Sequence, residues 1–332
     1  MVLALLLVTL ISSPVFADVE PPVSPFSTSL LRPGVTGEAY LDPCRYLQYQ
    51  WDTNRSAPGT VVVPIMFHSI TQPGKTPQEN TAITAEYFAE IIRHARELGF
   101  ETITSGELLR FLKYNESIPP RSMIFIVDDR RLGVVQEHFL PVLEANDWTV
   151  TLAYITGAAT ETEWTRMEEL LKTNRLDVQA HGFLHNGSTY FTKWTPEDVI
   201  QQEIWKPISL IEQHTGERPL AFIWPGGNFT PRSIEVAHTA GYQLGFTAYS
   251  RGPLMFNWIP LGQPERDMQD PLMVLPRAWS TAAYVNLDEA VAISNQYIAF
   301  SASRKIQELL YYYTQCPAPL TTSSQFPTQK ME

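Results

Sequence analysis

Past Gly59 the chain alternates short apolar runs with amphipathic stretches, and this alternation limits the folds that it can adopt. Each apolar run has the length of a buried strand, and each amphipathic stretch repeats apolar residues at helical spacing. Strands that alternate with helices form parallel βαβ units, and this many units favour a barrel or a doubly wound sheet. The sequence therefore predicts an α/β fold.

The predicted elements follow one another without a recognisable 20–50-residue repeat. Strands are expected at residues 61–67, 123–127, 150–155, 177–180, 220–224 and 244–247. Helices are expected at residues 84–99, 132–145, 163–172, 196–214, 231–240 and 287–313. The first of these helices has Thr84 as an N-cap and Gly99 as a stop signal.

Composition places the chain among ordinary globular proteins and argues against one class of partner. With 332 residues it can bury one large core or two modest ones, and 44% of its residues are hydrophobic. The formal net charge of −11 argues against nucleic acid, which would need clustered Lys and Arg. Arg130 and Arg131 form the densest basic spot, next to a carboxylate pair.

The first 17 residues have the pattern of a secretory signal peptide. Val2 to Ile11 is an apolar region, and Val15 to Ala17 offers small residues for cleavage, although no Lys or Arg precedes the apolar region. The stretch is short for a transmembrane span, and an N-terminal core strand or helix is the alternative. No second apolar run of spanning length follows. We therefore expect a secreted, periplasmic or cell-envelope protein.

The rest of the chain divides into three parts by composition. Residues 18–58 form an N-terminal extension, whose first half, Asp18 to Gly37, is rich in Pro and Ser and is expected to be an exposed linker. Residues 59–316 form the main domain. Residues 317–332 are a tail rich in Pro, Thr, Ser and Gln, which is expected to be disordered.

Two cysteines, Cys44 and Cys316, bracket the main part of the chain. In an oxidising compartment this arrangement suggests one disulfide that ties the ends together. Two unpaired thiols are the alternative, because the sequence does not give the Cα separation that a disulfide needs.

Two aspartates and two histidines suggest a metal site. Asp128 and Asp129 end an apolar strand, and His181 and His185 directly follow another. One carboxylate and two imidazoles, from Asp129, His181 and His185, are a typical ligand set for a hydrolytic divalent metal such as zinc. His-x-x-x-His on one helical turn would place both rings on one face. Asp128 then remains to accept a proton from water.

A plainer interpretation treats these residues as turn histidines and as a charge pair at a helix N-terminus. Their positions favour the metal interpretation. In parallel α/β folds functional groups gather at the carboxyl ends of the strands, and all four residues follow predicted strands. His68 and the turn Pro225-Gly226-Gly227 also follow predicted strands.

The sequence also resembles the polysaccharide deacetylase family (carbohydrate esterase family four) over about Gly59 to Trp279. Four of its features carry the resemblance. They are the strand ending in Ile126-Val127-Asp128-Asp129, the pair His181 and His185, the turn Trp224-Pro225-Gly226-Gly227, and the opening strand Val63-Pro64-Ile65-Met66-Phe67-His68. A late segment, Leu275-Pro276-Arg277, is similar to one found in some branches of the family.

The resemblance implies a distorted (β/α) barrel that removes N-acetyl groups from an acetylated amino-sugar polysaccharide. It assigns Asp129, His181 and His185 to a divalent metal, for which zinc is the best candidate, and Asp128 as the general base. A backbone N–H near Gly226 or Gly227 would hold the oxyanion together with the metal. Trp224 and Pro225 belong to the same loop. Trp224 is the aromatic residue favoured for contact with a sugar ring, although packing in the core or at the rim is the more common role for any single aromatic residue.

Two departures from the family pattern affect this assignment. Arg130 stands where the family usually has Gly, and a guanidinium beside the two carboxylates would lower their pKa values or pair with Asp128 and weaken it as a base. No histidine follows His238, so a late general-acid histidine is absent. His68 is then the candidate acid, with structural packing as its alternative role; otherwise Asp128 carries the proton both ways.

Two other functions are compatible with parts of the pattern. The departures leave open a catalytically inactive, carbohydrate-binding relative of the deacetylases. A glycosidase that uses Asp128 and Asp129 ranks last, because neighbouring residues on a strand point to opposite faces and would not flank one glycosidic bond. Other aromatic residues that could contact sugar rings are Tyr190, Phe191, Trp194, Trp258 and Trp279.

Overall fold

The computed structural model describes residues 25–185 and 190–317. The helices are α1 (Pro43–Gln50), α2 (Ala85–Glu97), α3 (Ser105–Tyr114), α4 (Leu132–Val134), α5 (Leu140–Asn146), α6 (Glu161–Leu171), α7 (Glu197–Thr215), α8 (Pro231–Ala240), α9 (Gln263–Arg266) and α10 (Ala283–Gln315). The strands are β1 (Thr36–Glu38), β2 (Val61–Phe67), β3 (Ile70–Thr71), β4 (Ile83–Thr84), β5 (Glu101–Thr102), β6 (Arg121–Val127), β7 (Val150–Tyr154), β8 (Leu176–Ala180), β9 (Ala221–Ile223), β10 (Leu244–Phe246), β11 (Leu254–Met255), β12 (Ile259–Leu261) and β13 (Ala278–Trp279).

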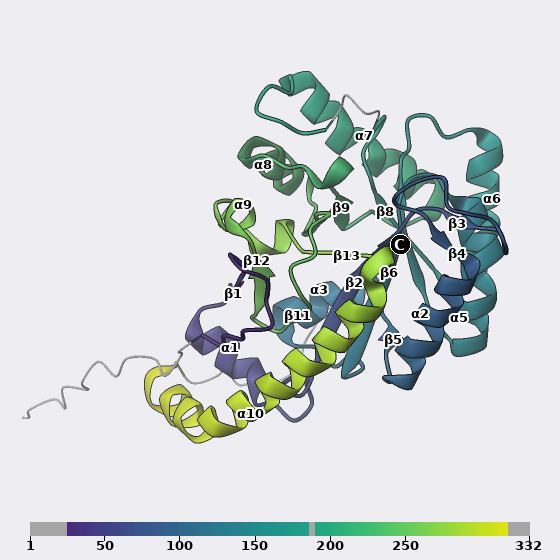
Figure 1. The fold of residues 1–332 in the computed structure, drawn as a ribbon. Coiled ribbons are helices and arrows are strands. Elements are labelled where there is room, and N and C mark those ends of the chain that lie inside the picture. Colours follow the sequence, from purple (N-terminus) through teal and green to yellow (C-terminus); the bar gives the residue numbers. More distant parts are fainter. Residues whose placement is uncertain (1–24, 186–189, 318–332) are drawn as a thin grey trace, which may run out of the picture.

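One curled sheet organises the molecule. Its strands lie in the order β10, β9, β8, β7, β6, β2 and β11, and every neighbouring pair is parallel except β2 with β11. Helices α2, α5, α6, α7 and α8 are arranged around its outside (Figure 1). This parallel half-barrel with surrounding helices confirms the predicted α/β fold and agrees with a distorted (β/α) barrel.

A short segment, residues 275–279, closes the barrel, and we call it the closing segment. Leu275 forms a parallel bridge to Phe246 of β10, and Ala278 and Trp279 pair in parallel with β2. The closing segment therefore joins the two ends of the parallel part of the sheet. Arg277 lies in the middle of this segment.

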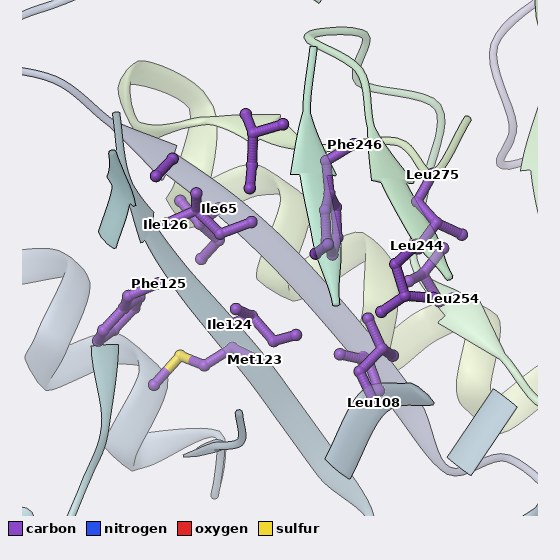
Figure 2. Close-up of a cluster of buried hydrophobic side chains, with 14 of the residues drawn as sticks. Ile65, Leu108, Met123, Ile124, Phe125, Ile126, Leu244, Phe246, Leu254 and Leu275 are labelled. Atoms are coloured by element: carbon purple, nitrogen blue, oxygen red, sulfur yellow. The ribbon is translucent and has the colours of Figure 1, made fainter. Parts of the chain in front are cut away.

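The strands at the centre of the sheet are buried on both faces because their side chains are almost all apolar. Strands β2 and β6 pair over seven residues each. Figure 2 shows Ile124 and Ile126 of β6 on the same side as Ile65, whereas Met123 and Phe125 point to the opposite face. Core packing on both faces fixes the register of β6, and hence the place where its carboxyl end meets solvent.

The long predicted elements are confirmed, and the differences occur in short or irregular ones. Helix α2 begins after Thr84, whose side chain accepts a hydrogen bond from the Tyr87 backbone N–H. The helix expected at 132–145 is interrupted by a π-helical turn at Val135–Phe139. Helices α1, α3 and α9 and the two-residue strands were not predicted. The shortest of these carry little periodic signal, whereas α3 has the same length as the predicted α8 and buries Leu108 and Leu112 at helical spacing.

The N-terminal extension packs against the main domain over its described residues. Phe26 and Val35 are buried, and β1 pairs antiparallel with β12. Of the segment expected to be an exposed linker, Asp18 to Gly37, the described part is exposed at most positions, but Phe26 and Val35 anchor it to the main domain. The predicted signal peptide, 1–17, and residues 318–332 of the tail lie outside the described residues.

Cys44 and Cys316 form a disulfide, as the oxidising interpretation predicted. It links α1 to the end of α10 across 272 residues of sequence. Within the described ranges, no helix combines the length and the apolar character needed to cross a membrane.

Loss of this disulfide is expected to lower the free energy of unfolding by about 2–4 kcal/mol, because the bond closes a very long loop in the unfolded chain. Urea unfolding of the oxidised protein and of the Cys44→Ser, Cys316→Ser double variant measures the difference. If the two proteins unfold at the same urea concentration and with the same dependence of the free energy on urea, the expectation is wrong.

Candidate active site

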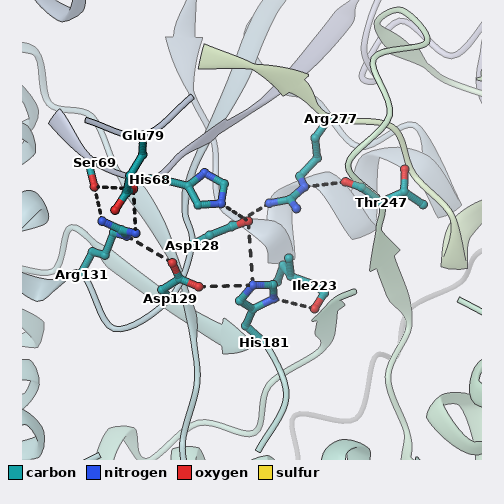
Figure 3. A network of polar contacts seen from close by, with 10 residues as sticks. All are labelled: His68, Ser69, Glu79, Asp128, Asp129, Arg131, His181, Ile223, Thr247 and Arg277. Atoms are coloured by element: carbon teal, nitrogen blue, oxygen red, sulfur yellow. Dashed lines mark hydrogen bonds and ion pairs between the residues drawn. The ribbon is translucent and has the colours of Figure 1, made fainter. Parts of the chain in front are cut away.

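A cleft of about 260 Å³ opens at the carboxyl ends of the central strands. Its lining residues come from segments far apart in the sequence: Met66, His68, Thr81, Asp128, Asp129, His181, His185, Tyr190, Gly226, Gly227, Ala248, Arg277 and Trp279. The polar groups at its centre are shown in Figure 3. The structure thus brings together His68, both aspartates, both histidines and the glycine turn, as the sequence predicted.

The two aspartates approach the same histidine although they are neighbours in sequence. The Asp128 N–H donates to the Phe67 carbonyl at 2.9 Å and continues the ladder between β6 and β2. Asp129 then adopts a left-handed backbone with φ of 72°, which changes the direction of its side chain. As a result, Nε2 of His181 lies 3.9 Å from Oδ2 of Asp128 and 3.9 Å from Oδ1 of Asp129.

The two histidines lie on a loop after β8, so the expected helical turn is wrong. Gly182 has φ of 86° and His185 has φ of 37°, and these left-handed positions are incompatible with a helix. The loop still brings the rings together, with centroids 4.4 Å apart. Nδ1 of His181 lies 2.8 Å from the Ile223 carbonyl, which leaves Nε2 directed at the two carboxylates.

Asp129, His181 and His185 fit a single divalent metal ion. One donor atom from each residue lies within 4.8 Å of the others. Zinc binds nitrogen and carboxylate oxygen at about 2.0–2.2 Å, so modest side-chain rotations would bring all three donors onto one ion. Burial lowers the pKa of His181 to about 4, against the opposing effect of the Asp128 charge. Its imidazole is therefore neutral near pH 7, as a metal ligand must be.

Asp128 is held by a buried arginine from the closing segment. Nη1 of Arg277 donates to Oδ1 of Asp128 at 2.6 Å, and its Nε donates to the Thr247 carbonyl at 2.6 Å. Burial alone would raise the Asp128 pKa, but the charge of Arg277, followed by those of His181 and His68, lowers it to about 2. Asp128 is therefore ionised at neutral pH.

His68 faces the cleft from the end of β2. Its Nε2 lies 3.7 Å from Oδ2 of Asp128, beyond direct hydrogen-bond distance. Its ring stacks on Trp279, with centroids 6.0 Å apart and planes 10° apart. Among the described residues, its Nδ1 has no hydrogen-bond partner. A histidine with only a structural role would be expected to form a hydrogen bond through Nδ1. The lack of such a bond is therefore consistent with an acid–base role for His68.

The glycine turn lies at the cleft wall and requires glycine at two positions. Gly226 and Gly227 have φ of 61° and 74°, and a Cβ atom on Gly226 would lie 2.9 Å from the Tyr190 ring. The Gly227 N–H donates to the Trp224 carbonyl at 2.8 Å. Gly226, which also lines the cleft, is therefore the glycine whose N–H is the better candidate for a contact with substrate.

Trp224 and Pro225 are part of the core rather than the cleft surface. Trp224 is fully buried, and its Nε1 donates to the Met273 carbonyl at 2.7 Å. The expected contact between Trp224 and a sugar ring is therefore wrong. Phe191 and Trp258 are buried as well, and Trp194 is 80% exposed. The aromatic residues that line the cleft are Tyr190 and Trp279.

Arg130 does not contact the aspartates, contrary to the expectation from its place in the sequence. Its Nη1 donates to the Ala158 carbonyl and approaches Glu163 at 3.4 Å. Arg131 instead donates to Asp129, with Nε 3.2 Å from Oδ2. Arg131 also contacts Ser69 and Glu79 (Figure 3). The guanidinium groups that act on the carboxylates therefore belong to Arg131 and Arg277.

Comparisons with known proteins agree with this geometry. Residues 116–245 match the family model described as polysaccharide deacetylase. No curated protein is a significant match to the chain.

Three solved structures have the same fold at low sequence identity. The Streptococcus pyogenes deacetylase PplD, in complex with acetate, is 19% identical with a TM-score of 0.57, over 71% of this chain and 99% of that chain. IcaB from Ammonifex degensii is 18% identical with a TM-score of 0.53, over 71% and 98% of the chains. A polysaccharide deacetylase from Bacillus cereus is 15% identical with a TM-score of 0.53, over 70% and 69% of the chains.

The matched region contains β6 with both aspartates, the loop with both histidines, and the glycine turn. The fold, the match to the family model and the order of these motifs along the chain are consistent with one another. Residues 116–245, fewer than half of the chain, therefore match the polysaccharide deacetylase family.

Proposed function

We propose that this protein is a metal-dependent hydrolase that removes N-acetyl groups from an acetylated amino-sugar polysaccharide. The observation that carries the proposal is the grouping of three donor atoms, from Asp129, His181 and His185, beside the ionised carboxylate of Asp128. The family match supports a deacetylase, and acetate, which the Streptococcus pyogenes deacetylase holds, is the product that such a reaction releases.

Each polar group of the cleft has its own role in the proposed reaction. A divalent ion such as zinc, when bound, polarises the acetamide carbonyl and makes a water molecule more acidic. Asp128 accepts the proton of the attacking water, and Arg277 keeps it ionised for this purpose. The Gly226 N–H, on the cleft wall, would be the backbone donor that stabilises the oxyanion. His68 protonates the amine that leaves.

The disulfide supports a site of action outside the cytoplasm. Structural disulfides persist in oxidising compartments, and this one joins α1 to the end of the last described helix. We therefore propose that the protein acts in an extracellular or cell-envelope compartment, where acetylated polysaccharides are found.

Asp128→Asn is expected to reduce acetate release by about 10²–10⁴-fold, because the amide cannot accept the proton of the attacking water. Acetate release from acetylated chitooligosaccharides and glucosamine polymers, with and without a chelator, measures the effect. Asp177→Asn is a matched control, since Asp177 contacts Ser105 and Thr151 at the start of β8 rather than the cleft. Binding of these substrates by the wild type without acetate release would favour the inactive relative.

Arg277→Gln is expected to move the acidic limb of the kcat/KM profile to higher pH. Without the guanidinium, burial raises the pKa of Asp128, and the base is ionised only at higher pH. Arg251→Gln is the control, because Arg251 pairs with the buried carboxylate of Glu265, which does not line the cleft. An unchanged acidic limb in Arg277→Gln would contradict this role.

His68→Gln is expected to slow acetamide hydrolysis by about 10²-fold or more, because the leaving amine must be protonated. Hydrolysis of 4-nitrophenyl acetate should change little, since nitrophenolate leaves without a proton. Comparison of kcat on the two substrates measures the difference, with His94→Gln as a control remote from the cleft. Equal losses on both substrates would exclude His68 as the acid.

A further inference from the structure

Helix α7 carries a buried carboxylate that the proposed reaction does not use. Glu203 is only 1% exposed, and the other buried residues of α7 are Ile200, Ile204, Pro207, Ile208 and Ile211. A carboxylate in such an apolar face is costly unless it is paired or receives several hydrogen bonds. The partners of Glu203 therefore indicate what it does.

Among the described residues, the partners of Glu203 are three consecutive backbone amides of the histidine loop. Oε2 accepts from the N–H groups of Phe183 at 2.8 Å, Leu184 at 3.1 Å and His185 at 3.3 Å. Oε1 accepts from the Leu184 N–H at 3.0 Å. Hydrogen bonds from amides to a charged carboxylate are roughly twice as strong as neutral ones.

The loop backbone is shaped to receive this anion. The left-handed positions at Gly182 and His185 flank the three amides and turn their N–H groups toward one point, as in anion-binding backbone nests. Gly182 also leaves room for the acid, because a Cβ atom there would lie 2.7 Å from Oε2 of Glu203. The loop conformation and the buried carboxylate therefore depend on each other.

The two metal-site histidines are held in different ways. The His181 backbone N–H donates to the Tyr154 carbonyl of β7 at 3.0 Å, and its ring is fixed by the Ile223 carbonyl of β9. Among the described residues, His185 has no such anchor in the sheet. Its backbone N–H bonds to Glu203, and its ring contacts the rings of His181 and Tyr190.

We propose that Glu203 is a positioning residue for metal binding, which sets the loop so that His185 reaches the ion held by Asp129 and His181. The proposal rests on the metal site of the proposed function. Glu203 acts through the backbone of the loop and does not touch the ion. Partners that orient metal ligands typically contribute 10–100-fold to metal affinity.

The test measures zinc affinity of the full chain by competition with a chromophoric chelator, and it needs no substrate. Glu203→Gln is expected to weaken zinc binding about 10–100-fold, because the uncharged amide presents a donor to the converging N–H groups. The visible spectrum of the Co²⁺-loaded protein should also change, since His185 no longer holds its place in the coordination geometry. Glu265→Gln, which removes an equally buried carboxylate elsewhere, should bind zinc as the wild type does.

A double-variant cycle separates positioning from stability. In a His185→Ala background, Glu203→Gln should cause no further loss of zinc affinity, because its effect passes through the missing ligand. Wild-type zinc affinity and an unchanged Co²⁺ spectrum in Glu203→Gln would overturn the proposal, even if its melting temperature falls. If that variant does not fold, Glu203→Asp replaces it, with the same expected direction and the same overturning result. Unchanged zinc binding in His185→Ala would instead refute the metal site itself.

Discussion

The ion pair between Asp128 and Arg277 connects the centre of the sheet to the segment that closes the barrel. Both side chains are almost completely buried, and Arg277 also donates to the Thr247 carbonyl just after β10. One guanidinium therefore ties the carboxyl ends of β6 and β10 to the closing segment. A buried charge left without its partner costs about 3–5 kcal/mol, so each of these groups constrains the position of the other. The same contact that completes the barrel also keeps Asp128 ionised.

Each aspartate uses one oxygen for an arginine and turns the other toward the cleft. Oδ1 of Asp128 accepts from Arg277, while its Oδ2 faces His68 and His181. Oδ2 of Asp129 accepts from Arg131, while its Oδ1 faces His181. The two pairs differ in burial, because Arg277 is enclosed and the Arg131 side chain is 27% exposed. Asp128 is thus fixed deep in the protein, whereas Asp129 lies nearer the open side, where an ion and its substrate would enter.

The sequence was sufficient to place the residues that follow strands, because parallel strands carry their carboxyl ends to one edge of the sheet. That rule located Asp128, Asp129, His68 and the histidine loop without any knowledge of side-chain contacts. It could not find the role of Arg277: the segment Leu275-Pro276-Arg277 resembles one in the family, but nothing near it in the sequence indicates a partner 149 residues away. It also misplaced Trp224, since an aromatic residue after a strand is equally compatible with the core.

The sequence does carry a weaker signal for Glu203. In α7 the acid falls on the same helical face as Ile200, three residues before it, and Pro207, four residues after it. An acidic residue within an apolar stripe implies a buried partner, although the sequence does not say which one. The partners here are backbone amides. Because every residue has a backbone, the sequence does not show which amides a side chain contacts.

The two ways of holding the histidines also explain why the loop departs from a helix. In the interior of a helix the N–H groups of residues 183–185 would bond to carbonyls one turn earlier, and Glu203 could not accept from them. The left-handed residues instead gather them on Glu203, which ties the loop to α7, while the sheet holds His181. The histidines of the candidate metal site therefore lie on residues 181–185, which the sheet holds at His181 and Glu203 of α7 holds at residues 183–185. In the proposed reaction, this arrangement leaves the cleft side of both imidazoles available to an ion, with no hydrogen bond to another described side chain there.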